Sequence, residues 1–202
     1  MTKTVCIIVV AVCAVLAFVA GVLLTDARGF SARDKPGVME SWVARRARKM
    51  TLPSGVTAQV NASADSTDVI AEARAHWADH CAVCHANNGS GDTEMGKHFY
   101  PPAPDMRAAE TQNLTDGELF YIIQNGVRWT GMPAWGNGTE RDAEDSWKLV
   151  RFIRHLPKLT PEEEKQMEAL NPKSPDELKE EQEEKDFLSG GEIHEQEHQH
   201  HH

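Results

Sequence analysis

The stretch Cys81-Ala82-Val83-Cys84-His85, CAVCH, decides how the rest of the chain is interpreted. Two thiols stand three positions apart, and a histidine follows the second one directly. Three kinds of site use such a group: a redox-active dithiol, half of a zinc site, or an attachment point for haem. The sequence on either side of the group is needed to choose among them.

The residues before the group argue against a redox dithiol. Residues 66–80, STDVIAEARAHWADH, place apolar side chains at Val69, Ile70, Ala73 and Trp77, which is helical spacing. A thioredoxin-like C-x-x-C is expected after a β-strand instead. We therefore predict a helix that leads into the motif.

A structural zinc site would need two further ligands at suitable spacing. The other cysteines, Cys6 and Cys13, lie in an apolar run, where we interpret them as small apolar residues. Three histidines could be recruited, although none has zinc-finger spacing: His76, His80 and His98. One helical turn would place both thiols of the motif on one side with His85 beside them, which suits haem attachment.

A second stretch strengthens the haem interpretation. In residues 126–136, GVRWTGMPAWG, Met132 lies in a loop between a glycine and a proline. A thioether sulfur is a common second iron ligand in c-type electron carriers and raises the potential. The alternatives for that position are Met95 and Met106, which we interpret as packing residues, and His98, which would give a lower-potential site.

Four motifs occur in a fixed order along residues 65–158. CAVCH is followed by YPPAPDM at 100–106, LTDGELFYIIQNGVR at 114–128 and TGMPAWG at 130–136. On these motifs the segment closely resembles the monohaem class I cytochrome c family. The resemblance implies an all-α, cytochrome c-like haem domain, with one covalently bound haem c, over residues 65–158.

The resemblance also implies roles for individual residues. Cys81 and Cys84 would carry the haem, and His85 and Met132 would ligate its iron. A carbonyl of the proline-rich segment would accept the other ring N–H of His85, which fixes the tautomer.

Three residues near Met132 have two interpretations each. Arg128 is either a partner of a haem propionate or a solvated charge. Trp129 and Trp135 either shield the haem edge or pack as ordinary apolar residues. We include Arg128 and Trp135 among the candidate cofactor-binding residues.

The helices of the haem domain can be placed from capping signals and periodicity. TDGE is a capping box in which Thr115 caps and Glu118 reaches back, and Gly126 should end that helix after Asn125. The last helix of the domain is expected at 141–156. Its apolar stripe is formed by four residues: Trp147, Val150, Ile153 and Leu156.

Residues 1–25 are predicted to be an uncleaved signal anchor. The run Thr4–Thr25 contains no charge and is long enough to cross a bilayer. The basic residues that follow it would favour a cytoplasmic location for the rest of the chain. The family resemblance implies haem attachment outside the cytoplasmic membrane, so we expect a single-pass protein of the inner membrane with its haem domain in the periplasm.

Residues 26–64 are predicted to be a basic juxtamembrane segment and linker. A short helix at 36–50 has a basic side, and it either lies on anionic lipid headgroups or acts as a solvated spacer that packs partly on the haem domain. Residues 51–66 contain small and polar residues typical of a linker.

Residues 159–202 are predicted to be an acidic helical extension. TPEE and SPDE are capping signatures that indicate helices at 161–170 and 175–187, which either dock weakly or extend from the body. The acidic arm could face a basic redox partner or simply aid solubility. The end is His-rich and could bind metal weakly through five residues: His194, His198, His200, His201 and His202.

The formal net charge of −10 is distributed as +5 over residues 1–64, −5 over 65–158 and −10 over 159–202. An acidic body argues against nucleic acid as a partner. We expect an electron carrier, not an enzyme, that exchanges single electrons with a quinol-oxidising complex, an oxidase or a reductase. The alternatives are a fixed cytochrome subunit of a larger membrane oxidoreductase, an enzyme or gas sensor whose methionine dissociates, and a metal-handling protein that uses the tail.

Overall fold

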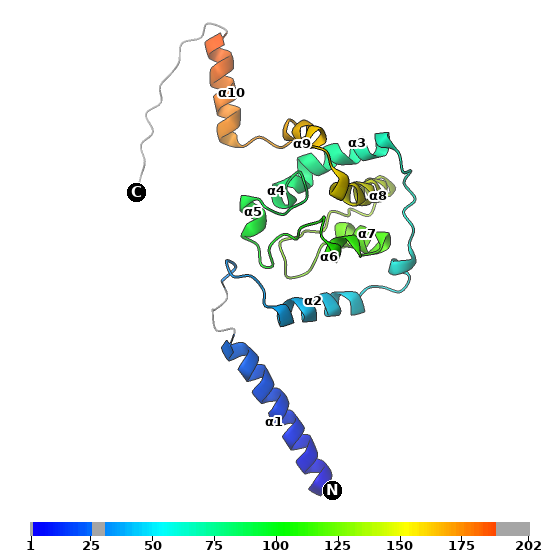
Figure 1. The fold of residues 1–202 in the computed structure, drawn as a ribbon, viewed down its shortest axis with the longest axis vertical. Coiled ribbons are helices and arrows are strands. Elements are labelled where there is room, and N and C mark those ends of the chain that lie inside the picture. The colour runs from blue at the N-terminus through cyan, green and yellow to red at the C-terminus, as the bar shows by residue number, and fades with distance from the viewer. Residues whose placement is uncertain (1, 26–30, 189–202) are drawn as a thin grey trace, which may run out of the picture.

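The computed structural model describes residues 2–25 and 31–188, and over these residues the chain forms helices and loops without a β-strand. The predicted all-α class is confirmed. The His-rich tail lies outside the described residues. Figure 1 shows a body of helices from which one helix projects at each end of the described chain. The α-helices in chain order are α1 (Thr2–Thr25), α2 (Val38–Met50), α3 (Thr67–His76), α4 (Ala82–His85), α5 (Glu94–Lys97), α6 (Ala109–Gln112), α7 (Asp116–Asn125), α8 (Glu140–His155), α9 (Pro161–Glu168) and α10 (Pro175–Leu188).

The core of the body forms where α3 packs against α8. Trp77 and Phe152 meet there with ring centroids 5.5 Å apart, and both are almost fully buried. Burying aromatic and aliphatic side chains of this size is the main stabilising contribution in a small domain. The α8 stripe is largely confirmed, because Val150, Ile153 and Leu156 are buried. Its fourth member, Trp147, is half-buried and stacks on Phe120 of α7.

Helix α7 begins and ends where the sequence predicts. Thr115 Oγ1 accepts a hydrogen bond from the Glu118 N–H, and the Glu118 carboxylate accepts one from the Thr115 N–H. These bonds satisfy two of the N–H groups that a helix start leaves unpaired. The helix ends at Asn125, where Gly126 takes a positive φ of 65°. An ion pair at 2.8 Å between Arg154 of α8 and Asp116 joins the two helices.

The segment between α2 and α3 lies against the body instead of hanging free. Val56 is buried, and the Asn61 amide donates to the Trp147 carbonyl at 2.9 Å. The Arg151 guanidinium donates to the Ser63 carbonyl. A Cβ at Gly117 would overlap the Val56 carbonyl, so the absence of a side chain there allows the close approach.

Helix α9 docks on the body. Met167 is fully buried in the same cluster as Trp77 and Phe152. Glu163 pairs with Arg74 of α3 at 3.2 Å and with His155 of α8 at 3.0 Å. Of the two arrangements left open for the acidic helices, α9 therefore adopts the docked one, whereas α10 has no buried residue and projects from the body (Figure 1).

Helix α1 is long and apolar enough to cross a membrane, and none of its residues from Lys3 to Val22 is buried in the protein.

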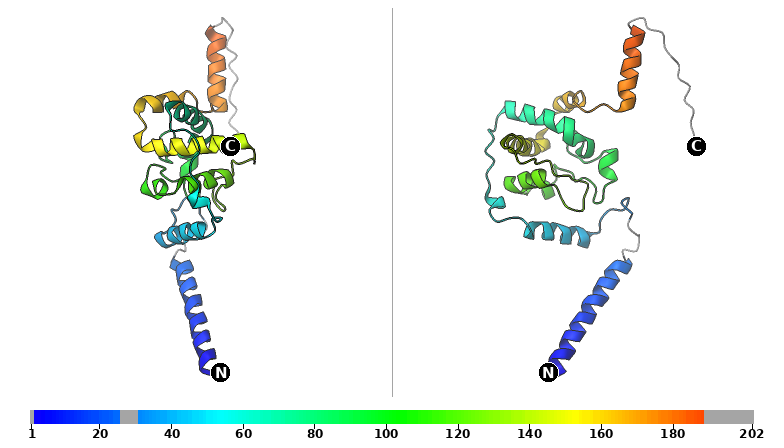
Figure 2. Two further views of the ribbon diagram at one scale, coloured as in Figure 1. Left: turned by 90° about the vertical axis from the view of Figure 1, so that its right-hand side faces the viewer. Right: turned by 180° about the vertical axis from the view of Figure 1, so that it is seen from behind.

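Figure 2 shows that α2 lies between α1 and the rest of the body in both further views. The helix predicted at 36–50 is present as α2, Val38–Met50. Arg48 and Lys49 lie in its last turn. Basic residues at this end of a helix interact favourably with its dipole.

Candidate haem-binding site

The CAVCH motif lies on a continuous helix. Helix α3 passes directly into a π-helical turn at Trp77–Cys81 and then into α4, which ends at His85. We predicted a helix that ends near residue 80, and the structure extends it through the motif by means of this wider turn. Such π turns inside helices are frequent at functional sites because they displace side chains from the regular helical register.

His85 is supported from the core side by Trp77. Their ring centroids are 5.7 Å apart, and the Trp77 indole N–H donates to the Ala86 carbonyl at 3.0 Å. Ala86 itself has φ 61° and ψ 160°, a conformation that is rare outside glycine and costs of order 1–3 kcal/mol. The packing around Trp77 holds this unfavourable backbone in place directly after the histidine.

The ring of His85 has one nitrogen enclosed by the protein. Its Nδ1 is buried, and no hydrogen-bond partner satisfies normal distances and angles to it. Burial lowers the pKa of His85, while the backbone of Pro104 opposes this by raising it. Ligating histidines commonly direct their second ring nitrogen at a backbone carbonyl, which fixes the tautomer. The backbone of Pro104 lies near enough to influence His85, but no hydrogen bond of normal geometry joins the two, so the carbonyl partner stays a prediction.

The loop after the motif brings Pro104 to this position. The Gly91 N–H donates to the His85 carbonyl at 2.9 Å, and the Met106 N–H donates to the Gly89 carbonyl at 2.7 Å. A Cβ on Gly91, which has φ 72°, would overlap the Ala103 carbonyl. The two loop segments at Gly91 and Ala103 therefore lie in direct contact beside the histidine, because glycine has no side chain to separate them.

The two motif cysteines form no disulfide with each other. Burial raises the pKa of Cys81 to about 12, with a smaller contribution from Cys84, whose own pKa burial also raises. A redox-active dithiol needs a lowered thiol pKa, so this environment does not suit that chemistry. Helix α5 closes over Cys84, since the Thr93 hydroxyl donates to its carbonyl at 3.2 Å and a Cβ on Gly96 would overlap the same oxygen.

Met132 lies in a loop that is tied back to the end of α7. The Val127 N–H donates to the Met132 carbonyl, and the Thr130 hydroxyl accepts from the Met132 N–H, both at 3.1 Å. A Cβ on Gly126 would lie 2.7 Å from the Met132 carbonyl oxygen. The side chain of Met132 is half-buried. Backbone hydrogen bonds therefore position this residue, whereas helix packing positions His85.

Two contacts connect the Met132 loop with the attachment side. A Cβ on Gly131 would lie 2.6 Å from the ring of Phe99, so this loop passes directly over that ring. Trp135 meets His80 edge-on, with the two ring centroids 5.7 Å apart. His80 directly precedes Cys81 in the sequence. The structure thus links both halves of the predicted site through Phe99 and Trp135, and the role of Phe99 gave no signal in the sequence.

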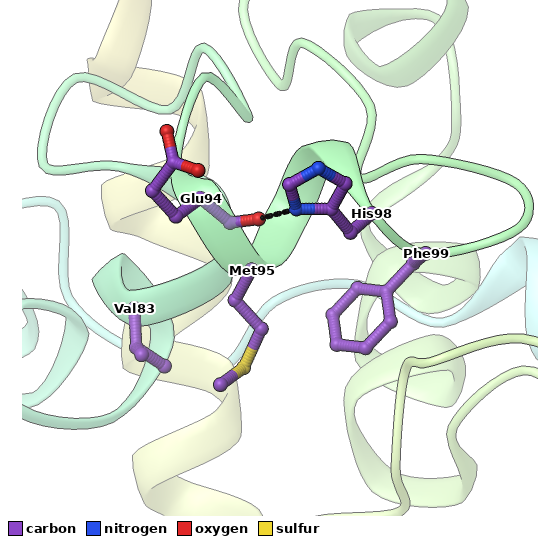
Figure 3. A pocket seen from close by; sticks show the side chains of 5 residues that line it. All are labelled: Val83, Glu94, Met95, His98 and Phe99. Carbon is purple, nitrogen blue, oxygen red and sulfur yellow. Dashed lines mark hydrogen bonds between the residues drawn. The ribbon is translucent and has the colours of Figure 1, made fainter. Parts of the chain in front are cut away.

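An open hollow of about 470 Å³ lies beside the attachment turn (Figure 3). Val83, from between the two cysteines, forms one wall, and the Met95 side chain points into the space between Val83 and Phe99. The His98 ring turns back toward the Glu94 carbonyl, to which its Nδ1 lies at 2.6 Å. Apolar walls that include the motif itself suit the face of a porphyrin.

The alternative ligands differ in their surroundings. Met106 packs against the core cluster, which confirms its interpretation as a packing residue. Met95 is half exposed in the hollow, where it would face a bound porphyrin, so its interpretation as a packing residue stays a prediction. His98 is exposed as well. Met95 and His98 therefore remain the residues to compare with Met132 by experiment.

The aromatic and basic residues around Met132 fall into two groups. Trp135 covers part of the attachment side through His80. Trp129 is 91% exposed and has a φ of 61°, so its interpretation as a packing residue is wrong. Arg128 is exposed, which fits both a propionate partner and a solvated charge.

Comparison with known families identifies the domain. Residues 68–153 match the family model for cytochrome C oxidase, cbb3-type, subunit III. Over these residues the chain is a c-type cytochrome, as the order of its motifs predicts. The comparison with curated proteins finds no match. The matched range includes CAVCH and the Met132 loop and ends within α8.

Proposed function

We propose that this protein is a membrane-anchored monohaem c-type cytochrome that passes single electrons between respiratory redox partners on the periplasmic side of the cytoplasmic membrane. The observation that supports it most is the continuous helix that presents CAVCH and ends at His85, inside a domain matched by a cytochrome family. Helix α1 would supply the anchor. The periplasmic side follows from the attachment of haem outside the cytoplasm.

In this proposal the chain's residues have distinct tasks. Haem c, when bound, would supply an iron that exchanges one electron at a time. Cys81 and Cys84 would hold it through two thioether bonds, and His85 would ligate the iron with its ring oriented by Pro104. Met132 would provide the second ligand from its hydrogen-bonded loop.

The surrounding side chains would control solvent and charge. Trp135 and Phe99 would limit water at the two sides of the pocket, and Arg128 would pair with a propionate. If His85 and Met132 both ligate the iron, no position is left for oxygen or a substrate. That arrangement favours electron transfer over catalysis.

A second candidate is a fixed cytochrome subunit of a larger membrane oxidoreductase. The matched family is described as subunit III of a cytochrome c oxidase, which favours this candidate. The same domain would serve in either setting, because both need only a bound haem with an accessible edge. A carrier would dissociate from one redox partner and move to another, whereas a subunit would stay bound to the same partner chains.

Extraction of the full chain in a mild detergent distinguishes them. A mobile carrier purifies as a 22.4 kDa chain plus one haem, and its reduced-minus-oxidised spectrum is that of a c-type cytochrome. The reduced form should also fail to bind carbon monoxide. Stable copurification with hydrophobic partner chains would favour the subunit. Purified full chain that is colourless would contradict both.

A further inference from the structure

Helix α2 presents two different faces. Its less exposed residues, Glu40, Ser41 and Arg48, lie on the side that faces the body. Glu40 accepts a hydrogen bond from the Tyr100 hydroxyl at 2.5 Å. Burial lowers the pKa of Arg48, and the nearby carboxylate of Glu118 opposes this. The Glu40 bond therefore attaches α2 to the body, and Arg48 lies on the same side of the helix near Glu118.

The opposite face of α2 combines apolar and basic side chains. Two rows with helical spacing run along it, one through Val38 and Trp42 and the other through Met39 and Val43. Arg46 and Lys49 extend the same rows toward the C-terminal end. The apolar residues are exposed as follows: Val38 88%, Met39 57%, Trp42 58%, Val43 51% and Met50 78%.

The position and charge of this face indicate what covers it. Twelve residues separate the end of α1 from the start of α2, a length that reaches at most roughly 40 Å when fully extended. A spanning α1 would therefore keep α2 near the bilayer. Helix α2 contains four basic residues and one acidic residue in a chain of net charge −10, so it is the part suited to an anionic surface.

We propose that the outward face of α2, comprising Val38, Met39, Trp42, Val43, Arg46, Lys49 and Met50, lies on the anionic lipid headgroups of the membrane that α1 spans. This proposal rests on the anchoring in the proposed function and extends it. Tryptophan and apolar side chains would enter the headgroup boundary while the basic side chains pair with phosphate. Because the Glu40 bond and the packed segment after α2 hold this helix against the body, the haem domain would be kept in one orientation and would not swing freely on its linker.

The test uses the full haem-loaded chain in lipid nanodiscs. A fluorescent label is placed at Val43→Cys in a Cys6→Ala/Cys13→Ala background, and a matched label at Glu183→Cys on exposed α10 serves as control. The discs contain phosphatidylcholine, with or without phosphatidylglycerol, and with or without nitroxide-labelled lipid. Comparing each disc with and without nitroxide removes the constant quenching by haem.

We expect nitroxide lipid to quench the Val43 label in anionic discs and to leave the Glu183 label unchanged. Replacing Arg46 and Lys49 with glutamine should lower the ratio of docked to free α2 by roughly fivefold per charge. Added salt should act in the same direction.

Three results would overturn the proposal. The first is a Val43 label no more quenched than the Glu183 label. The second is quenching that is equal in purely zwitterionic discs and unaffected by the two substitutions, which would exclude headgroup recognition. The third is protection of Val43 only when a protein partner is added. Failure of the chain to coelute with discs would instead refute the anchor itself, so the two failures are distinguishable.

Discussion

The two segments that would ligate the haem iron are built in different ways. His85 ends a continuous helix and is backed by buried Trp77, with α8 and α9 behind it. Met132 lies in a loop held mainly by hydrogen bonds to its own neighbours and to the end of α7. Both segments contain a non-glycine residue at positive φ, Ala86 and Trp129. The difference implies that damage to the core should affect the attachment side, whereas damage to the loop should change the second ligand alone.

The largest effect is expected from removing the attachment itself. Replacing Cys81 and Cys84 together with alanine should abolish covalent haem binding, because both thioether bonds are lost. Haem staining after denaturing electrophoresis measures this directly. The matched control, Cys6→Ala with Cys13→Ala, should stain like the unaltered chain. Full staining of the first variant would show that the motif does not attach haem.

Loss of Met167 tests the packing behind the attachment side. Met167→Ala should lower the free energy of unfolding by about 2 to 5 kcal/mol, because it leaves a cavity in a fully buried site. Leu170→Ala removes a side chain that is 45% exposed and should cost far less. Denaturant unfolding of the haem-loaded chain measures both. Equal effects would mean that α9 does not dock as described.

The Met132 loop can be disturbed without touching the attachment side. Gly126→Ala should destabilise the loop by about 1–3 kcal/mol for the positive φ with extended ψ, with a further cost from overlap with Pro133 and Met132. Covalent haem should remain, while absorption that depends on the methionine ligand weakens. Gly138→Ala is the control, since Gly138 also has a positive φ but no atom lies within 4 Å of its Cβ position. If both variants keep the same spectrum, the loop does not position Met132.

The smallest effect is a pH dependence of α9 docking. Burial by itself raises the pKa of Glu163, but hydrogen bonds from Thr160 and His155 lower it overall below its ordinary 4.5. A lowered carboxyl pKa stabilises the fold above 4.5, and the contribution is lost as the pH falls through the folded value. The partly exposed pairs limit it to roughly 1 kcal/mol or less.

The Tm difference between the unaltered chain and Glu163→Gln should therefore shrink as the pH falls from neutral to below 4.5. Glu162→Gln, on the exposed side of α9, should show little difference at either pH. If the Tm difference between the unaltered chain and Glu163→Gln stays constant across this pH range, the titration of Glu163 is not its cause.

Much of this arrangement could be predicted because it depends on local sequence. Capping residues such as Thr115 and Glu118 define helix ends through bonds to their own neighbours. The CAVCH motif and the Gly-Met-Pro loop are equally local. Periodicity also placed Val150 and Ile153 in the core, since they recur on one side of α8.

Other features depend on contacts between distant segments, which local patterns do not encode. The position of Pro104 near His85 requires the crossing of the loop at Gly91 with the chain at Ala103. Phe99 becomes part of the pocket because Gly131 passes over it. The docking of α9 rests on Met167, whose surroundings come from α3 and α8. The π turn before Cys81 likewise has no simple sequence signature.

The most direct test of the whole account is a redox titration of three chains: unaltered, Met132→Ala and Met95→Ala. If Met132 is the second ligand, Met132→Ala should keep its covalent haem but lose the methionine-dependent absorption. Its midpoint potential should fall by on the order of 100 mV, within the ~0.8 V that axial ligands set. Met95→Ala should leave both nearly unchanged. The account is contradicted if Met132→Ala keeps the spectrum and potential of the unaltered chain, or if Met95→Ala is the variant that loses them.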